Sequence, residues 1–333
     1  MNFIKKSCEY AAKKHWDNIA KPLNGLGDFE DIIVKIAGIQ NTEHVDISKK
    51  ALVIMCADNG IVEENVSQSG QDVTAIVAAN MASRKSSVCL MAGYTGVQVI
   101  PVDIGIACET IPSGKKIDDM DGILHKKISH GTKNFLKEHA MTDKQCIKAI
   151  ETGKEIVKMC SEKGINIIAT GEMGIGNTTT SAALAAILLD EKPENVTGYG
   201  AGLTNEGLKN KTETVRKACE MYSGYKDDAL KLLSCIGGLD IAGLAGVFIG
   251  GAEYGIPVVI DGLISGIAAL TAEYMSPGTK KYMIASHAGK EPALKKILTQ
   301  LELKPVIDAN LALGEGSGAV MVFPLLDMAM SVY

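Results

Sequence analysis

A glutamate inside a glycine-rich turn is the residue whose setting most suggests chemistry. The turn covers residues 171–176, holds Glu172 and contains three glycines. The apolar, β-branched run at 165–170 predicts a buried parallel strand before the turn, and the polar residues at 177–180 are N-cap candidates for a helix after it. Backbone N–H groups point out of a first helical turn, so this arrangement suits an anion. A carboxylate beside an anion site costs electrostatic free energy, so its presence there suggests a functional role.

The turn alone allows two interpretations. It is either an ordinary connection between a strand and a helix, in which Gly and Thr are common, or a cradle for phosphate. No Gly-Lys-Ser/Thr sequence follows, so it is not a P-loop. The spacing of Gly171, Gly174 and Gly176 does not match the dinucleotide fingerprint, which disfavours a dinucleotide dehydrogenase.

Other expected strands also end in polar residues. These ends are Asp58-Asn59 after a strand at 51–56, Asp103 after one at 97–102, and Ser286-His287 after one at 282–285. Because the carboxyl ends of parallel strands meet at one edge of a sheet, we expect these residues to converge near Glu172. A second glycine turn holds Glu315 and enters the last helix. Two glycine turns and two carboxylates suit a phosphorylated substrate and a general base.

Each of these residues also has a structural interpretation. Glu315 fits an exposed loop acid or a helix cap, and Asp58 fits a cap of the turn that follows it. His287 fits a buried structural histidine, and Lys211 fits a solvated lysine on a helix. Spacing alone does not decide between these interpretations.

Composition limits the class of protein. Of the 333 residues, 46% are hydrophobic but only 5% aromatic, so the core must consist mainly of Ala, Val, Ile, Leu and Met. The net charge of −5 argues against nucleic acid or an anionic membrane as the main partner. The eight cysteines show no zinc-ligand spacing, which predicts free thiols and no metal. Without a signal-peptide pattern or an unbroken apolar span, we predict a cytoplasmic protein.

The elements that position these residues alternate between strand and helix for most of the chain. This alternation predicts an α/β fold with a parallel sheet, with helices at 72–82 and 229–236 among its elements and a less regular polar connection at 107–133. Both terminal segments have helical patterns, and we expect them to pack together as a small helical domain.

Several motifs occur in the order of one known family. They lie at residues 21–27, 57–60, 171–179, 237–240, 258–262, 286–287 and 313–319. Together they resemble the nicotinate-nucleotide–dimethylbenzimidazole phosphoribosyltransferase family, which activates the lower-ligand base of cobamides such as vitamin B12. The resemblance implies a Rossmann-like parallel sheet flanked by helices. It also implies a small helical domain from residues 1–45 plus about 295–333, a large α/β nucleotide- and base-binding domain at 46–294, and a homodimer or a heterodimer with a paralogue.

The resemblance also implies roles for single residues. Glu315 resembles the general base of the family, and Glu172 is a second candidate catalytic carboxylate. The residues implied to bind the phosphate and ribose of nicotinate mononucleotide are Gly174, Ile175, Gly176, Asn177, Thr178, Lys211, Ser286, Gly314 and Gly316. Those implied to form the base pocket are Ser69, Val77, Met173, Asp58 and Asn59. No cofactor is implied.

The chemistry of that reaction fits the residues present. Nicotinate departs neutral from a pyridinium, the ribose C1 gains oxocarbenium character, and the attacking base must lose a proton to a carboxylate. The sequence departs from the family pattern at Asn24 and Gly25 in the first turn, at Asn59, at Val77 where relatives carry glutamine, and at Ala312 where a relative has arginine.

The resemblance implies transfer to dimethylbenzimidazole or a related base. The loss of an amide at position 77 leaves a more apolar pocket, which would suit a phenol, so our hypothesis is that the acceptor is not dimethylbenzimidazole, and the choice of acceptor stays open. Two alternatives to a catalytic phosphoribosyltransferase stay open. One is a weakly active subunit that supports a paralogue in a heterodimer, and the other is a non-catalytic nucleotide-binding protein.

Overall fold

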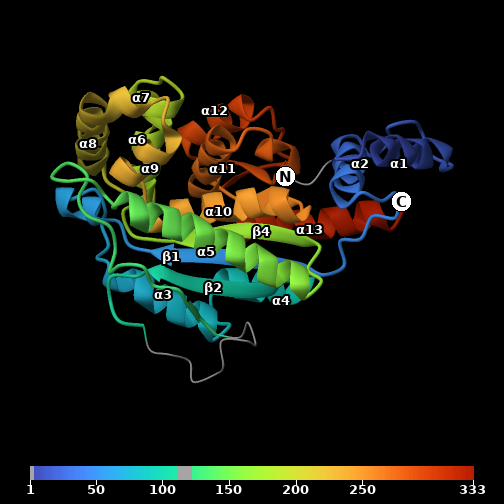
Figure 1. Cartoon of the computed structure of the whole chain (residues 1–333), viewed down its shortest axis with the longest axis horizontal. Coiled ribbons are helices and arrows are strands. Elements are labelled where there is room, and N and C mark those ends of the chain that lie inside the picture. The colour runs from blue at the N-terminus through green and yellow to red at the C-terminus, as the bar shows by residue number, and fades with distance from the viewer. Residues whose placement is uncertain (1–3, 111–121) are drawn as a thin grey trace.

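The computed structural model of the chain describes residues 4–110 and 122–333. Within these ranges, a six-stranded parallel sheet runs through the centre with helices on both faces (Figure 1). The strands, in their order across the sheet, are β3 (Leu124–His125), β2 (Gln98–Gly105), β1 (Lys50–Ala57), β4 (Ile167–Met173), β5 (Val258–Ile260) and β6 (Met283–Ala285). This is the strand order of a doubly wound, Rossmann-like fold. The predicted fold class is confirmed.

The strand order reverses between β1 and β4, the position at which doubly wound sheets bind ligands. The two strands pair in register, with Cys56 opposite Met173. After β4, the chain turns sharply over the carboxyl end of β1. A Cβ at Gly174 would lie 2.1 Å from the carbonyl oxygen of Ala57. Only glycine fits there, so the sequence of the turn determines how closely it covers β1.

Two cores lie on opposite faces of the sheet, because successive side chains of a strand point to opposite faces. Ala51, Val53 and Met55 of β1 belong to the first core, and Leu52 and Ile54 belong to the second. The helices of the first core are α5 (Asp143–Glu162), α6 (Asn177–Leu188), α7 (Pro193–Val196), α8 (Asn205–Tyr222), α9 (Ala229–Ile236), α10 (Leu239–Tyr254), α11 (Leu263–Met275) and α12 (Pro292–Gln300). Those of the second are α1 (Lys6–Asn18), α2 (Asp28–Gln40), α3 (Asp72–Ala82), α4 (Ser87–Thr95) and α13 (Ser317–Met330).

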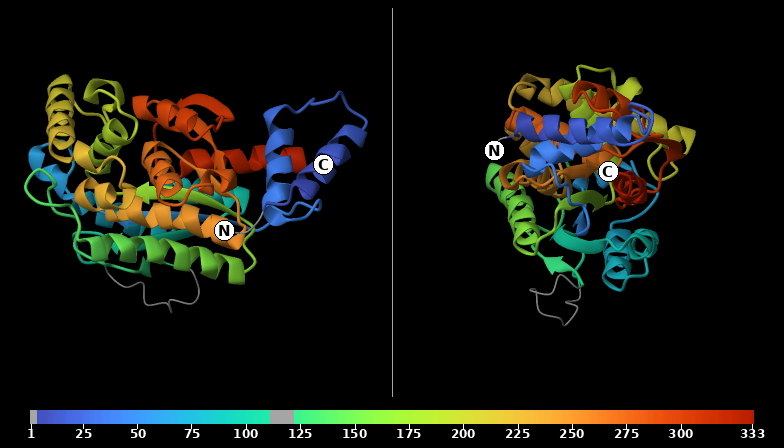
Figure 2. Two further views of the ribbon diagram at one scale, coloured as in Figure 1. Left: turned by 45° about the horizontal axis from the view of Figure 1, so that its top comes forward. Right: turned by 90° about the vertical axis from the view of Figure 1, so that its right-hand side faces the viewer.

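The terminal helices lie together at one end of the molecule, with α1 and α2 beside α13 (Figures 1 and 2). The buried Trp16 ring lies 5.0 Å from that of Tyr333, measured between centroids. In the 21–27 turn, Lys21 donates to the buried Glu30 at 2.6 Å and lies over Trp16. Helix α12 packs instead against α11 and α7. The division at about residue 295 stays a prediction.

Several elements were not predicted from the sequence. They are α4, α7, β3, a second two-stranded parallel sheet of β7 (His287–Gly289) and β8 (Ile307–Leu311), and the 3₁₀ helices Gly60–Glu64, Ser223–Tyr225 and Thr279–Tyr282. The irregular connection expected at 107–133 lies partly outside the described residues. All eight cysteines are free, as predicted, although Cys108 is exposed. Among the described helices, none is long and apolar enough to cross a membrane.

Candidate active site

The end of β4 lies against the glycine turn that enters α13. A Cβ on Gly171 would lie 2.6 Å from the carbonyl oxygen of Glu315, and one on Gly316 would lie 3.0 Å from that of Thr170. The two backbones approach this closely because both residues are glycines. Gly171 and Glu172 were expected in the glycine turn, but β4 continues to Met173, so the contact brings the strand end that carries Glu172 next to the turn that holds Glu315.

A cavity of about 200 Å³ opens beside this contact. Its walls come from the turn before α6, the connection between β5 and α11, strand β7 and the loop before α13. The predicted mononucleotide-binding residues in these walls are Gly174, Ile175, Asn177, Thr178 and Gly314. Ala312, one of the departures from the family pattern, also lines it. The predicted turn residues are therefore grouped around one ligand-sized space.

A second cavity of about 70 Å³ lies at the N-terminal end of α6. It shares residues 174–178 with the larger cavity except Gly176, and Ser69 lies in its wall together with Tyr199. Gly176 is the N-cap of α6 and has a left-handed φ of 94°. The first turn of α6 thus faces both cavities, with the positive end of the helix dipole directed toward them.

Glu172 and Asp240 share the side-chain amide of Asn177. The amide donates to Glu172 Oε2 at 2.5 Å and to Asp240 Oδ2 at 3.0 Å. Burial, together with the negative charges of Asp240, Asp261 and Glu315, raises the pKa of Glu172 to about 8. Burial also raises the pKa of Asp240 to about 6. Glu172 is therefore mostly protonated at neutral pH.

The Glu315 carboxylate lies on the α4 side of the sheet. Its backbone has a left-handed φ of 60°, and the backbone N–H of Val88, at the start of α4, lies near enough to its carboxylate to favour the charged form. The Oε2 atom is buried and has no hydrogen-bond partner among the described residues. Burial raises the pKa of Glu315, and the negative charge of Asp261 adds to this effect. Such a carboxylate is a stronger base than an exposed one.

Lys211 on α8 is fully buried, contrary to the solvated interpretation. Its ammonium group donates to Thr178 Oγ1 at 2.8 Å and to the Gly198 carbonyl oxygen at 3.0 Å. Burial lowers the pKa of Lys211 to about 8, and the Glu291 carboxylate opposes this shift. Lys211 lies behind the cavity wall and reaches it through Thr178.

Asp261 fixes the glycine turn that carries Glu315. Its carboxylate accepts hydrogen bonds from the backbone N–H groups of Gly316 at 3.2 Å and Ala319 at 3.0 Å, at the start of α13. Ser286 is buried, and its hydroxyl lies 2.9 Å from Nδ1 of His287. Burial lowers the pKa of His287, which favours the neutral imidazole. His287 lines the larger cavity, whereas Ser286 lies behind it.

The predicted base-pocket residues separate into two groups. Val77 and Met173 are partly buried and pack against the second core, on the same side of the sheet as the Glu315 carboxylate. Asp58 and Asn59 are fully buried beneath the turn before α6 and are absent from the walls of both cavities. Their side chains contact other parts of the protein, and contact with a base stays a prediction.

Sequence reasoning gave no role to Asp240, Asp261 or Glu291. The first two lie in the motifs 237–240 and 258–262, so the resemblance was the available signal. Glu291 lines the larger cavity, accepts from the Gly200 N–H at 2.9 Å, and has a second buried oxygen without a described partner. Nothing in the sequence distinguishes it from an ordinary residue before a helix.

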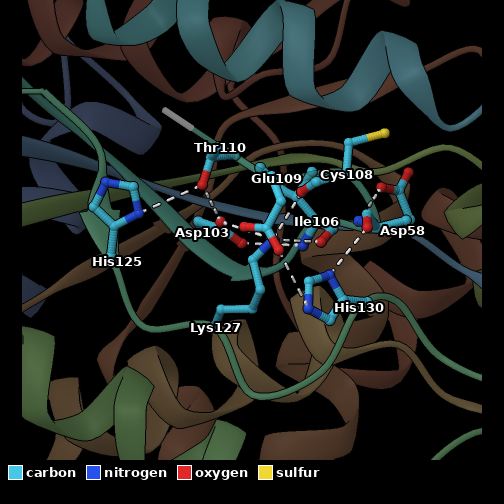
Figure 3. Close-up of polar contacts among 10 residues, drawn as sticks. Asp58, Asp103, Ile106, Cys108, Glu109, Thr110, His125, Lys127 and His130 are labelled. Atoms are coloured by element: carbon cyan, nitrogen blue, oxygen red, sulfur yellow. Dashed lines mark hydrogen bonds and ion pairs between the residues drawn. The ribbon is translucent and has the colours of Figure 1, made fainter. Parts of the chain in front are cut away.

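Asp103 does not join the cavity, although it ends a strand of the same sheet. It lies on β2, and its carboxylate accepts hydrogen bonds from the Thr110 hydroxyl and the Ile106 N–H. The Lys127 ammonium nitrogen lies 3.4 Å from its Oδ2 atom (Figure 3). The prediction that Asp103 lies near Glu172 is therefore wrong, because β1 separates β2 from β4.

Comparison with known proteins gives the family. A protein-family model described as Phosphoribosyltransferase matches residues 1–333. The chain is 44% identical to the nicotinate-nucleotide–dimethylbenzimidazole phosphoribosyltransferases of Acetivibrio thermocellus and Clostridium acetobutylicum, covering 96% of this chain and 89% of each relative. The crystal structure of CobT from Thermus thermophilus is 33% identical and superposes with a TM-score of 0.91, covering 98% of this chain and 96% of that one. This chain therefore belongs to the nicotinate-nucleotide–dimethylbenzimidazole phosphoribosyltransferase family and is a phosphoribosyltransferase enzyme.

Proposed function

We propose that the enzyme transfers phosphoribose from nicotinate mononucleotide to an aromatic cobamide lower-ligand base, producing an α-ribotide and nicotinate. One observation carries this proposal. The cavity beside the carboxyl end of β4 joins a helix N-terminus, suited to phosphate, to the strand end that packs against the loop of Glu315, whose carboxylate has a buried oxygen without a partner among the described residues.

The phosphate belongs at the start of α6 in this proposal. Backbone N–H groups of the turn and the Thr178 hydroxyl supply donors, and Lys211 supplies a positive charge behind Thr178. A phosphate would stabilise the charged form of Lys211, whose pKa burial lowers to about 8. Glu291 in the same wall has a buried oxygen with no partner among residues 4–110 and 122–333, which is an acceptor for a ribose hydroxyl.

Glu315 acts as the general base. The acceptor attacks C1 of the ribose as the C–N bond to nicotinate breaks, and the electron pair of that bond leaves with the nicotinate nitrogen. The proton lost by the acceptor moves to Glu315 Oε2, which has no described hydrogen-bond partner. Holding both substrates against fixed backbone turns supplies the entropic part of the rate enhancement.

The acceptor lies on the α3–α4 side, between Met173 and Val77. Both side chains are apolar, so a base there makes few polar contacts besides the one to Glu315. A phenol requires one proton acceptor, whereas benzimidazole also presents a second ring nitrogen. We therefore propose a phenolic acceptor for this chain.

Nicotinate release from the mononucleotide tests both parts of the proposal. Purified protein is assayed with phenol, p-cresol, dimethylbenzimidazole and adenine in parallel. Release with phenols, at a kcat/KM above that with dimethylbenzimidazole, is the expected result. Preference for dimethylbenzimidazole would remove the phenol proposal and leave the transferase. Binding of the mononucleotide without release by any acceptor would favour the supporting-subunit alternative.

A further inference from the structure

The turn before α6 is held in place at Ile175, whose main-chain N–H and carbonyl oxygen both form hydrogen bonds. The Ile175 N–H donates to Thr74 Oγ1 at 3.2 Å, and the Ile175 carbonyl oxygen accepts from the Asn59 N–H at 3.0 Å. Ile175 lines both cavities. The position of the anion-binding turn therefore depends on the two groups that hold Ile175.

Thr74 is itself held by a buried carboxylate. Its hydroxyl donates to Asp58 Oδ1 at 2.5 Å while it accepts from Ile175. Both Thr74 and Asp58 are fully buried. With its proton committed to Asp58, the hydroxyl presents a lone pair to the Ile175 N–H, so the direction of both hydrogen bonds is determined.

Asp58 connects this pair to a second segment. Its Oδ2 atom accepts from the Ala107 N–H at 2.8 Å. The backbone on both sides of Ala107 is fixed by Lys127, which belongs to the cluster around Asp103. Lys127 donates to the carbonyl oxygens of Ile106 and Cys108, each at 2.8 Å (Figure 3). Asp58 lies at the margin of that cluster and receives a donor whose position the cluster fixes.

We propose that Thr74 and Asp58 are positioning residues, which hold the mononucleotide-binding turn at Ile175 and tie it to helix α3. The proposal rests on the proposed function. Thr74 and Val77 lie three residues apart on α3, within one helical turn. The same hydroxyl therefore links the turn that receives phosphate to the helix that faces the acceptor. Neither residue needs to touch a substrate for this role.

The test uses Thr74→Val, which keeps the shape of the side chain and removes its hydroxyl. Because the turn holds the phosphate equally in the ground state and the transition state, we expect a rise of about tenfold in KM for nicotinate mononucleotide with kcat little changed. Thr74→Ser restores the hydroxyl and should bring KM back to within about threefold of the wild-type value.

The matched control is Thr271→Val. Thr271 is also fully buried, but its hydroxyl bonds to the Ile267 carbonyl oxygen within α11. This variant should lose stability without a change in KM. Equal KM values for Thr74→Val and wild type, or a KM rise in Thr74→Val that Thr74→Ser does not reverse, would overturn the proposal.

A double-mutant cycle with Asp58→Asn tests whether the two residues act as a unit. In that case the effect of the double variant on KM is smaller than the product of the single effects. Multiplicative effects would contradict a shared chain of hydrogen bonds. Wild-type turnover is measured first, since its absence refutes the proposed function, whereas active wild type with unresponsive variants refutes only the positioning role.

Discussion

Among single residues, Glu315 has a buried carboxylate oxygen without a hydrogen-bond partner in the described part of the chain, which suits the proton transfer proposed above. Glu315→Gln keeps the size of the side chain and an oxygen atom near the Val88 N–H, but it cannot take a proton. We expect kcat to fall by about 10²-fold to 10⁴-fold with mononucleotide affinity retained. Steady-state kinetics and calorimetric binding measure the two quantities separately.

The pH dependence gives a second check on the same residue. Because burial raises the pKa of Glu315, kcat/KM of the wild type should rise with pH through that raised pKa, as the base becomes ionised. The Glu315→Gln variant should not show this rise of kcat/KM with pH. Wild-type turnover in the Gln variant would make Glu315 a structural residue of its turn.

Glu172 should influence stability through its titration. Its pKa is about 8 in the folded protein against 4.5 ordinarily, so between these values the folded chain keeps a proton that the unfolded chain has lost. The contribution of Glu172 to stability is therefore complete below pH 4.5 and falls as pH rises toward 8. We expect Glu172→Gln to match the wild-type Tm near pH 4.5 and to exceed it increasingly up to pH 8.

Thermal unfolding at a series of pH values measures that difference. Glu220→Gln, on the exposed surface of α8, controls for the change in net charge. A Tm difference that did not vary with pH would show that Glu172 keeps its ordinary ionisation in the folded protein.

At the scale of elements, the turn before α6 depends on the absence of a side chain at Gly176. Its φ is 94°, and a Cβ would lie 2.9 Å from the Asn59 carbonyl oxygen. Gly176→Ala therefore adds a steric conflict to a backbone strain of about 1–2 kcal/mol. We expect a lower Tm and a raised KM for the mononucleotide.

Gly202→Ala is the matched control for that variant. Gly202 has a similar φ of 91°, but no atom lies within 4 Å of its added Cβ. It should show the strain alone, with a smaller loss of Tm and an unchanged KM. Equal KM effects for the two alanine variants would mean that close packing over Asn59 does not determine the anion site.

The elements predicted correctly are those with a strong local pattern. The bounds of α3 and α9 match the expected helices, and β1 follows from an uninterrupted apolar run, whereas the strand expected at 165–170 runs from Ile167 to Met173. Helix α4 was missed because its apolar residues do not follow one stripe, and it leaves Leu90 and Tyr94 exposed. The pairing of β7 with β8 was missed because β7 has only three residues without an apolar pattern, and each strand is stabilised by the other.

The candidate site was predictable where its residues are close in sequence. Residues 174–178 form one turn, and all except Gly176 line the larger cavity. The role of Asp58 was not predictable, because its partner Thr74 lies on another element. The Thr74 hydroxyl gains its second hydrogen bond only when the fold brings Ile175 beside it. Glu291 likewise reaches the cavity through the fold alone.

At the scale of the whole molecule, the terminal helices share a core with the sheet. The second core runs from Trp16 on α1 through α2 and α13 to Leu52 and Ile54 of β1. Such continuity favours cooperative unfolding of the small helical unit with the rest of the chain. Trp16 is the single tryptophan of the sequence, so its fluorescence reports on that unit alone.

We therefore expect denaturant midpoints from Trp16 fluorescence and from far-UV circular dichroism to coincide. Tyr333→Ala removes the ring beside Trp16 and the hydroxyl that donates to the Glu43 carbonyl oxygen at 2.7 Å, and it should lower the free energy of unfolding seen by both probes by about 1–2 kcal/mol. Tyr94→Ala, at a residue that is 91% exposed on α4, should shift neither midpoint. If fluorescence changed at a lower denaturant concentration than circular dichroism, the terminal helices would be a separately unfolding domain, and their shared core with β1 would contribute little to cooperativity.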